Sequence, residues 1–247
     1  MPLKLRSLYR RPDAFPMPDF VEAGGRQVPV TVRENARAKR LILRVAPDGG
    51  VIVTVPPRTR KKVLSDFITR HRDWIAERAG GAAAPVTVAD GCTIPIRGAA
   101  IRLVHCGGRR VTRLDTDSRE LSIGGMPEHF SRRVKDFLRK EAKVDLTAAV
   151  SNHAVRVGLS PNALSLKDTV SRWGSCTSDR RLSFSWRIVM APPNVLDYLV
   201  AHEVAHFKEM NHSAAFWALC RDLCPDMDEG RTWLKANGAS LHRIRFD

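Results

Sequence analysis

The stretch 195–217, VLDYLVAHEVAHFKEMNHSAAFW, holds three of the chain's eight histidines and a carboxylate between two of them. These residues are His202, Glu203, His206 and His212. Residues four apart on a helix lie on one face, so a helix through this stretch would present His202 and His206 to one point. Zinc binds imidazole nitrogens at about 2.0–2.1 Å, which this spacing allows. The stretch therefore predicts a metal-binding helix.

Apolar residues surround the first two histidines at helical spacing, which favours a buried helix over a solvated one. They are Leu196, Leu199, Val200 and Val204. Glu203 would lie beside the metal rather than on it. From there its carboxylate can act as general base and take a proton from a zinc-bound water. The H-E-x-x-H pattern alone is short and also occurs without a metal, so the apolar flanks and the third histidine strengthen the prediction.

His212 is the third ligand that we expect. Asn211 can take the left-handed conformation that ends a helix, and such a turn would bring His212 back to the metal. Ser213 could then cap the following helix. Three histidines with one position left for water are typical of a catalytic zinc site. The acidic alternatives for the third ligand are Glu209, Asp222 and Asp226.

The periodicity of the chain predicts an α+β protein with three segments. Residues 1–26 are rich in proline and form a flexible arm, and residues 27–125 form a basic, mostly β unit with one helix. A hairpin is expected around Pro47–Gly50 in LILRVAPDGGVIVTVPP, and a helix with Thr59 as its N-cap should follow. Four short β-rich runs, CTIPI, AIRLVH, RVTRL and RELSI, complete this unit.

The third segment, 126–247, is predicted to be the catalytic unit. A long basic helix should begin near Pro127 and end near Gly158. The strands ALSLKDTV and RLSFSWRIV should flank the turn SRWGSCTSDR, 171–180. A helix from about Pro192 and a second helix after His212 should follow.

Charge suggests a polyanionic partner. The chain has 41 Lys and Arg against 26 Asp and Glu, a formal net charge of +15, which can attract nucleic acid or simply keep a surface solvated. The candidate nucleic-acid-binding residues are Arg33, Arg37, Lys39, Arg40 and Arg44.

Two features favour a cytoplasmic protein that has no membrane partner. The sequence has no apolar run near the ~20 residues of a membrane-spanning helix, and its first residues lack the apolar core of a signal peptide. The five cysteines are an odd number in a sizeable chain, which indicates reduced thiols rather than a disulfide framework.

Beyond the histidine motif, the segments SRWGSC and LSFSWRIVMAPPNVLDYLVAHE, with HEVAHFKEMNHSAAFW, closely resemble the YgjP-like metallopeptidase family, relatives of the SprT-like zinc metalloproteases. The resemblance covers roughly residues 27–237. It implies a zincin-like catalytic part and one Zn²⁺ held by His202, His206 and His212, with Glu203 as catalytic base. The family usually has Asn at the position of Ser185, so the resemblance assigns no role to that side chain.

Three further residues are candidates for lining the cleft or stabilising the oxyanion, and they are Arg172, Ser175 and Tyr198. The turn RWGSC just before the zinc helix could place Arg172 near the attacked carbonyl. Packing alone could also explain this turn, and the same holds for Tyr198. Cys176 could approach the metal, although three histidines leave it no necessary role.

The sequence thus predicts a zinc-dependent metallopeptidase that acts on a protein or peptide. The strand LSFSWRI would align the substrate at the edge of the cleft. The alternative is a nucleic-acid-associated protein with a structural or vestigial zinc site, or a protease acting on DNA-bound proteins. Glu203 separates the catalytic from the structural alternative, because a structural zinc site does not need a general base.

Overall fold

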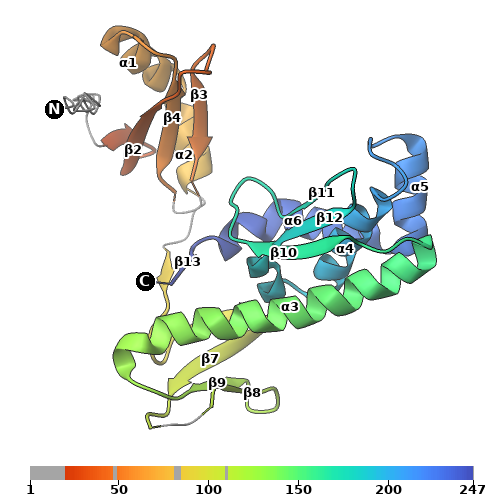
Figure 1. Ribbon diagram of the computed structural model, residues 1–247. Helices are drawn as coiled ribbons and strands as arrows, with labels where there is room; N and C mark the ends of the chain where they lie inside the picture. Colours follow the sequence, from red (N-terminus) through yellow and green to blue (C-terminus); the bar gives the residue numbers. More distant parts are fainter. Residues whose placement is uncertain (1–19, 47–48, 81–84, 109–110, 247) are drawn as a thin grey trace, which may run out of the picture. The chain divides into compact units, whose positions relative to one another are not determined.

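The protein consists of two compact units, 1–84 and 85–247, seen here in a computed structural model (Figure 1). The structure describes residues 20–46, 49–80, 85–108 and 111–246. Each unit has its own cluster of buried apolar side chains. None of the described helices is long and apolar enough to cross a membrane.

The boundary between the units differs from the one the sequence predicted. It lies at 84/85 instead of 125/126, because the β-strands between residues 93 and 123 share their core with the long helix of the second unit. The predicted arm, 1–26, is also too long, since its residues from Phe20 onward form strands. Residues 1–19 lie outside the described residues.

The N-terminal unit is a four-stranded sheet with two helices. Its elements are β1 (Phe20–Ala23), β2 (Arg26–Glu34), β3 (Ile42–Val45), β4 (Val51–Val55), α1 (Lys61–Arg70) and α2 (Arg72–Gly80). The strand order is β1-β2-β4-β3, with β2 and β4 parallel and the other pairs antiparallel. Alternate residues of β4, which are Val51, Val53 and Val55, are buried together with Leu64, Ile68 and Ile75 of the helices.

The structure confirms the expected pairing of β3 with β4, although Pro47 and Asp48 of the predicted hairpin turn lie outside the described residues. The helix that the sequence predicted is two helices, because the first ends at Arg70, with His71 as its C-cap, and the second begins at Arg72. Thr59 is not the N-cap. The cap position is Arg60, which makes no side-chain capping bond, whereas the Thr59 hydroxyl donates to the Pro56 carbonyl at 2.7 Å.

The second unit is built around one long helix. Its elements are β5 (Val86–Thr87), β6 (Thr93–Ile96), β7 (Ala99–His105), β8 (Arg113–Asp115), β9 (Glu120–Ile123), the 3-10 helix η1 (Pro127–His129), α3 (Phe130–Val157), β10 (Ala163–Lys167), β11 (Gly174–Cys176), β12 (Arg181–Ser185), the 3-10 helix η2 (Trp186–Met190), α4 (Pro193–Ala205), α5 (Ala214–Leu223), α6 (Met227–Leu241) and β13 (Ile244–Arg245). The helix α6 was missing from the sequence-based prediction.

Helix α3 has the predicted limits and separates two layers of the second unit. It ends at Val157, and its C-cap is Gly158, whose φ of 73° is the left-handed conformation that favours glycine. Its buried stripe includes Phe130, Val134 and Leu138. In Figure 1 the sheet β6-β7-β9-β8 lies on one side of α3, and the elements from β10 to α6 lie on the other.

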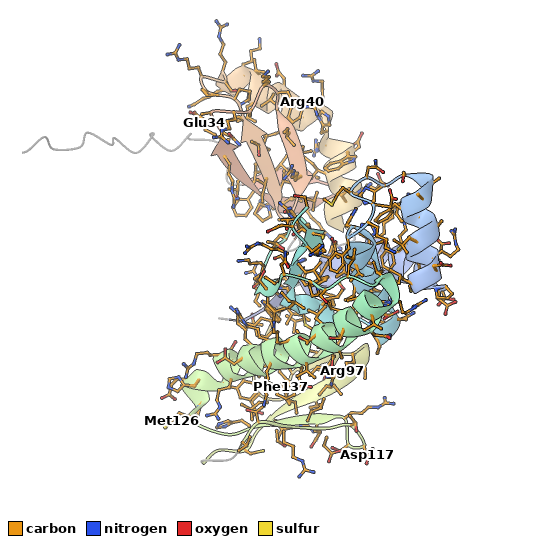
Figure 2. All side chains as sticks on the ribbon, turned by 45° about the vertical axis from the view of Figure 1, so that its right-hand side comes forward. Glu34, Arg40, Arg97, Asp117, Met126 and Phe137 are labelled. Atoms are coloured by element: carbon orange, nitrogen blue, oxygen red, sulfur yellow. The ribbon has the colours of Figure 1, made fainter. Side chains whose placement is uncertain are left out.

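The β6–β7 turn ties this sheet to the helix and to the segment that precedes α4. The guanidinium of Arg97, labelled in Figure 2, donates to both carboxylate oxygens of Asp145 and to Glu141, each at 2.8 Å. These bonds raise the pKa of Arg97 although its partial burial opposes the shift. The backbone N–H of Arg97 donates to the Val189 carbonyl at 2.7 Å, which ties the turn to η2, the segment just before α4.

A small sheet of order β10-β12-β11 lies next to α4. Strand β12 is parallel to β10 and antiparallel to β11. This corrects two predictions. The segment 171–180 is not only a turn, since Gly174–Cys176 pairs as a strand, and LSFSWRI is not at an edge, since β12 lies between two partners and becomes η2 at Trp186.

Two separate cores predict two separate unfolding transitions. Leu64→Ala and Leu138→Ala each empty a site that is fully buried, one in each unit, and each should cost about 2–5 kcal/mol. In urea denaturation followed by hydrogen exchange, Leu64→Ala should lower the midpoint of the N-terminal unit alone and Leu138→Ala that of the second unit alone. Equal shifts of both units by either variant would show a single cooperative core.

Candidate metal centre

Helix α4 carries His202 and Glu203, and it is buried on nearly all sides. Nine of its thirteen residues are buried, so apolar packing on almost every side fixes the position of the helix. The helix ends at Ala205, and His206 is its C-cap residue. Glu203 is 5% exposed and His206 is 9% exposed.

The chain returns to α4 through a turn that the sequence predicted only in part. Asn211 does not adopt the left-handed conformation that we expected. The described non-glycine residues with a positive φ are Arg58, Arg97, Arg119 and Arg180. The Asn211 side-chain oxygen instead accepts a hydrogen bond from the backbone N–H of Ser213 at 3.2 Å, a local turn that Asn favours. The predicted cap is confirmed, since the Ser213 hydroxyl accepts from the N–H of Phe216 at 3.2 Å. This loop brings His212 to the helix.

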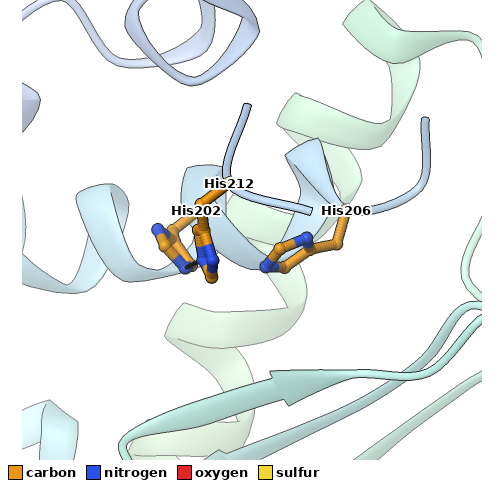
Figure 3. A group of neighbouring side chains, drawn as sticks. All are labelled: His202, His206 and His212. Carbon is orange, nitrogen blue, oxygen red and sulfur yellow. Dashed lines mark hydrogen bonds between the residues drawn. The ribbon is translucent and has the colours of Figure 1, made fainter. Parts of the chain in front are cut away.

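The three histidines form one cluster, drawn in Figure 3. One nitrogen from each of His202, His206 and His212 lies within 4.8 Å of the other two. The Nε2 atoms of His202 and His212 are 3.1 Å apart. Among the described residues, no other group of His, Cys, Asp or Glu side chains converges in this way.

The rings are held in a form that can bind a cation. His206 Nδ1 lies 2.8 Å from the Glu209 carbonyl, which can only accept, so Nδ1 carries the proton and Nε2 is left as a lone-pair donor. Burial, with the other two histidines, lowers the pKa of His202 to about 4, and burial also lowers the pKa of His206. Neutral imidazoles are the form that metals bind. Phe216 contacts all three rings.

The dimensions fit a zinc ion. Tetrahedral zinc with Zn–N distances of about 2.0–2.1 Å places its ligand nitrogens about 3.3–3.4 Å apart. The separation of His202 and His212 is close to that value, and the whole group is slightly wider. The buried Nδ1 of His202 has no hydrogen-bond partner among the described atoms, whereas Nδ1 of His206 is held by the Glu209 carbonyl.

Glu203 lies beside the cluster as a buried carboxylate. Burial raises its pKa to about 7, and the charge of Arg172 opposes the shift. A carboxyl group with a pKa near neutrality can both accept and release a proton at physiological pH.

Strand β11 reaches Glu203 at a glycine. A Cβ atom on Gly174 would lie 2.5 Å from Glu203 Oε1, 2.8 Å from its Cγ and 2.9 Å from its Cδ. Real Cβ atoms do not approach other heavy atoms so closely, so position 174 must lack a side chain if Glu203 is to stay where it is. Local sequence patterns do not predict this role of Gly174, because it depends on a contact between residues 29 positions apart.

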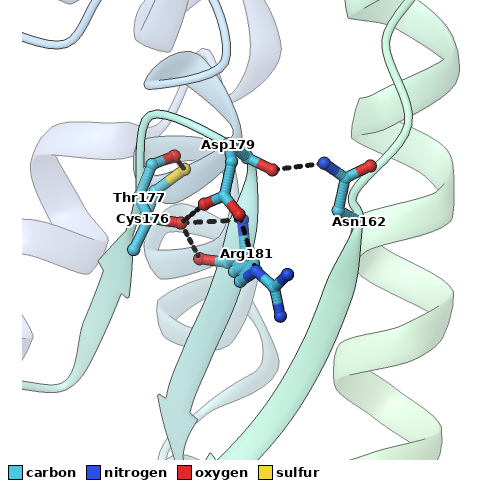
Figure 4. A network of polar contacts seen from close by, with 5 residues as sticks. All are labelled: Asn162, Cys176, Thr177, Asp179 and Arg181. Atoms are coloured by element: carbon cyan, nitrogen blue, oxygen red, sulfur yellow. Dashed lines mark hydrogen bonds and ion pairs between the residues drawn. The ribbon is translucent and has the colours of Figure 1, made fainter.

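The turn from β11 to β12 holds this strand in place, as Figure 4 shows. The Asp179 carboxylate accepts from the Thr177 hydroxyl at 2.5 Å and from Arg181 Nε at 2.6 Å. Asn162 Nδ2 donates to the Asp179 carbonyl at 2.5 Å, which links the turn to the start of β10. Cys176 ends β11 next to this network.

An open pocket of about 260 Å³ contains the cluster. Its lining residues are Gly174, Ser175, Cys176, His202, Glu203, His206, Met210 and His212. Of the three predicted cleft residues, Ser175 lines the pocket. Arg172 is exposed nearby and acts on Glu203 through its charge. Tyr198 is 7% exposed, does not line the pocket, and packs against Gly230 and the ring of His202.

The acidic alternatives for a third ligand are not part of the cluster. Only the backbone carbonyl of Glu209 takes part, through His206, and Asp222 and Asp226 are exposed on or after α5. Burial raises the pKa of Cys176 to about 11, with a further contribution from Glu203, so its thiol stays protonated near neutral pH.

The predicted basic residues lie in the other unit, and all of them are exposed: Arg33, Arg37, Lys39, Arg40 and Arg44.

A helix that carries His-Glu-x-x-His, with a third histidine returned to it and the carboxylate beside the cluster, is the site type of the metallopeptidases. The chain belongs to the YgjP-like family, since the sequence model of the YgjP-like metallopeptidase domain matches residues 39–237. The match extends over parts of both units. Comparisons with curated proteins and with solved structures gave no significant match.

The contact between Gly174 and Glu203 can be tested by a double-mutant cycle. Gly174→Ala forces a methyl group against the carboxylate and should lower the free energy of unfolding by about 1–3 kcal/mol. In the Glu203→Ala background the same change should cost markedly less, because the overlapping atoms are gone. Ser175→Ala, its neighbour in β11, serves as the control and should show no coupling. Equal cost of Gly174→Ala in both backgrounds would mean that Glu203 is not what excludes the methyl group.

Proposed function

We propose that the protein is a zinc-dependent metallopeptidase with a zincin-like catalytic unit. The observation that supports this most directly is the meeting of three histidine side chains with a buried carboxylate in one open pocket. The family membership supports the same reaction class.

His202, His206 and His212 would hold one Zn²⁺. When bound, zinc would polarise the scissile carbonyl and make the attacking water more acidic. His206 is fixed for this role by its bond to the Glu209 carbonyl, and His212 depends on the Asn211 turn and the Ser213 cap.

Glu203 would act as general base and then as general acid. Its carboxylate takes a proton from the water that attacks the peptide carbonyl and gives it to the leaving amine. Gly174 keeps this carboxylate close to β11, and the exposed guanidinium of Arg172 favours its ionised form. Because a structural zinc site needs no such group, the burial of Glu203 beside the cluster favours catalysis over a structural or vestigial site.

The substrate would lie along β11. This strand lines the pocket, and its described partner, β12, occupies one edge only. An extended peptide could therefore add to the other edge by backbone hydrogen bonds. This replaces the earlier assignment of that role to LSFSWRI, which is central in its sheet. Ser175 is the middle residue of β11 and lines the pocket where the scissile bond would pass.

Zinc binding can be tested ligand by ligand. Alanine at His202, His206 or His212 should each sharply reduce the zinc that remains after dialysis, measured by elemental analysis, because each removes one of three nitrogen ligands. Glu209→Ala should retain zinc, since only its carbonyl takes part, and Asp222→Ala should too. Full zinc in His212→Ala together with loss in Asp222→Ala would show that the third ligand is wrong.

Glu203→Gln tests the reaction itself. The change keeps size and hydrogen bonding but removes the base, so zinc content should be unchanged while hydrolysis of a peptide library falls by about 10²–10⁴-fold. A chelator-treated sample controls for contaminating proteases. Equal cleavage by the wild type and Glu203→Gln at equal zinc content would exclude Glu203 from the mechanism, and cleavage by neither would count against the proposed activity.

A further inference from the structure

The N-terminal unit has a groove that the proposed reaction does not use. It has a volume of about 440 Å³ and runs between strand β3 and the two helices. Its lining residues are Arg40, Leu41, Ile42, Leu43, Arg44, Phe67, His71 and Trp74. Five of these eight are consecutive residues of β3 and its approach, so one side of the groove is the strand itself.

Strand β3 is at the edge of its sheet. The order β1-β2-β4-β3 gives it β4 on one side, and no described strand pairs with the other side. In an antiparallel pair, every second residue directs its N–H and C=O away from the partner. Part of the β3 backbone therefore offers hydrogen bonds to an added strand.

Apolar and basic side chains lie along this edge. Leu41, Leu43 and Val45 pack against the apolar core on the helix side. Arg44, between Leu43 and Val45, is exposed and directs its side chain to the opposite face, as Ile42 does. Arg40 is exposed just before the strand. In the described part of the chain neither guanidinium has an acidic partner. Figure 2 labels Arg40 on this unit.

Aromatic rings form the helix side of the groove. Phe67 and His71 are half-buried, their ring centroids are 4.4 Å apart in a tilted arrangement, and His71 Nδ1 lies 2.7 Å from the Phe67 carbonyl. Trp74 is 36% exposed. A single-stranded nucleic acid would need several open ring faces for its bases, whereas these partly covered rings suit apolar side chains that reach in from a neighbouring strand.

We propose that this groove binds an extended peptide segment in which acidic and apolar residues alternate. The segment adds to β3 as a strand, its apolar residues enter the groove toward Phe67 and Trp74, and its carboxylates meet Arg40 and Arg44. The unit as a whole favours an anionic partner, since residues 1–84 contain 17 Lys and Arg against 8 Asp and Glu. If the proposed peptidase function holds, this segment belongs to the substrate protein and recruits it.

Binding can be measured on the full chain, in its Glu203→Gln form so that no peptide is cut. The probe is a short fluorescein-labelled peptide of alternating valine and glutamate, followed by anisotropy. Arg40→Glu with Arg44→Glu should weaken binding by about tenfold or more. The matched control is Arg26→Glu with Arg33→Glu, which changes the net charge equally on exposed residues of β2 outside the groove, and it should change binding by less than about threefold.

Hydrogen exchange gives a second measurement that does not depend on variants. The peptide should slow exchange of amides in β3, because added-strand pairing covers them. Equal weakening by both double variants, equal binding of a valine–lysine peptide, or no binding would overturn the proposal. Displacement of the peptide by oligothymidylate without protection of β3 would assign the surface to nucleic acid instead. Since binding requires no hydrolysis, an inactive enzyme would not affect this result.

Discussion

The candidate metal site of the second unit depends on a carboxylate that is kept out of water. Burial of an ionisable group is unfavourable unless neighbours compensate for it, and the pKa of about 7 at Glu203 reflects that cost. The side chain stays in place because α4 is anchored on almost every side and because β11 approaches it without a Cβ atom. The polar turn around Asp179 then holds β11 to β12. The Glu203 carboxylate, strand β11 and this turn therefore constrain one another.

Helix α6 packs against α4 and against Trp173, the residue before β11. A Cβ atom on Gly230 would lie 2.6 Å from the Cβ of Tyr198 on α4, and one on Gly238 would lie 2.9 Å from the indole nitrogen of Trp173. Both glycines therefore allow α6 to approach closely. Trp173 immediately precedes Gly174, and its ring also contacts that of His242 in a tilted arrangement, with the centroids 4.7 Å apart. The position of β11 thus depends on a helix more than fifty residues later in the chain, and a change at Gly238 would act on Glu203 through Trp173.

The sequence was informative where the physics is local. The spacing of His202 and His206, the ends of α3 and the cap at Ser213 follow from helical periodicity and capping preferences, and the structure has all three. It was misleading where a local preference competes with tertiary packing. Asn211 can end a helix in the left-handed conformation, yet here it closes a turn through its side chain. Gly174, the edge position of β11 and the boundary at residue 84 depend on contacts between distant segments, which no local pattern encodes.

The chemistry of the pocket limits how the proposed peptidase could select a substrate. Apart from Glu203 and the three histidines, its lining residues are Gly174, Ser175, Cys176 and Met210. These residues carry no formal charge, and the pocket has a volume of only about 260 Å³. Such a surface can position a backbone but discriminates weakly between side chains, since an apolar contact distinguishes neighbouring residue types by only about 1–3 kcal/mol. Selectivity would then have to come from binding away from the scissile bond. The groove along β3, with the exposed Arg40 and Arg44, is suited to that task as proposed, because a second contact on the same chain would raise the local concentration of substrate at the pocket without altering the reaction there.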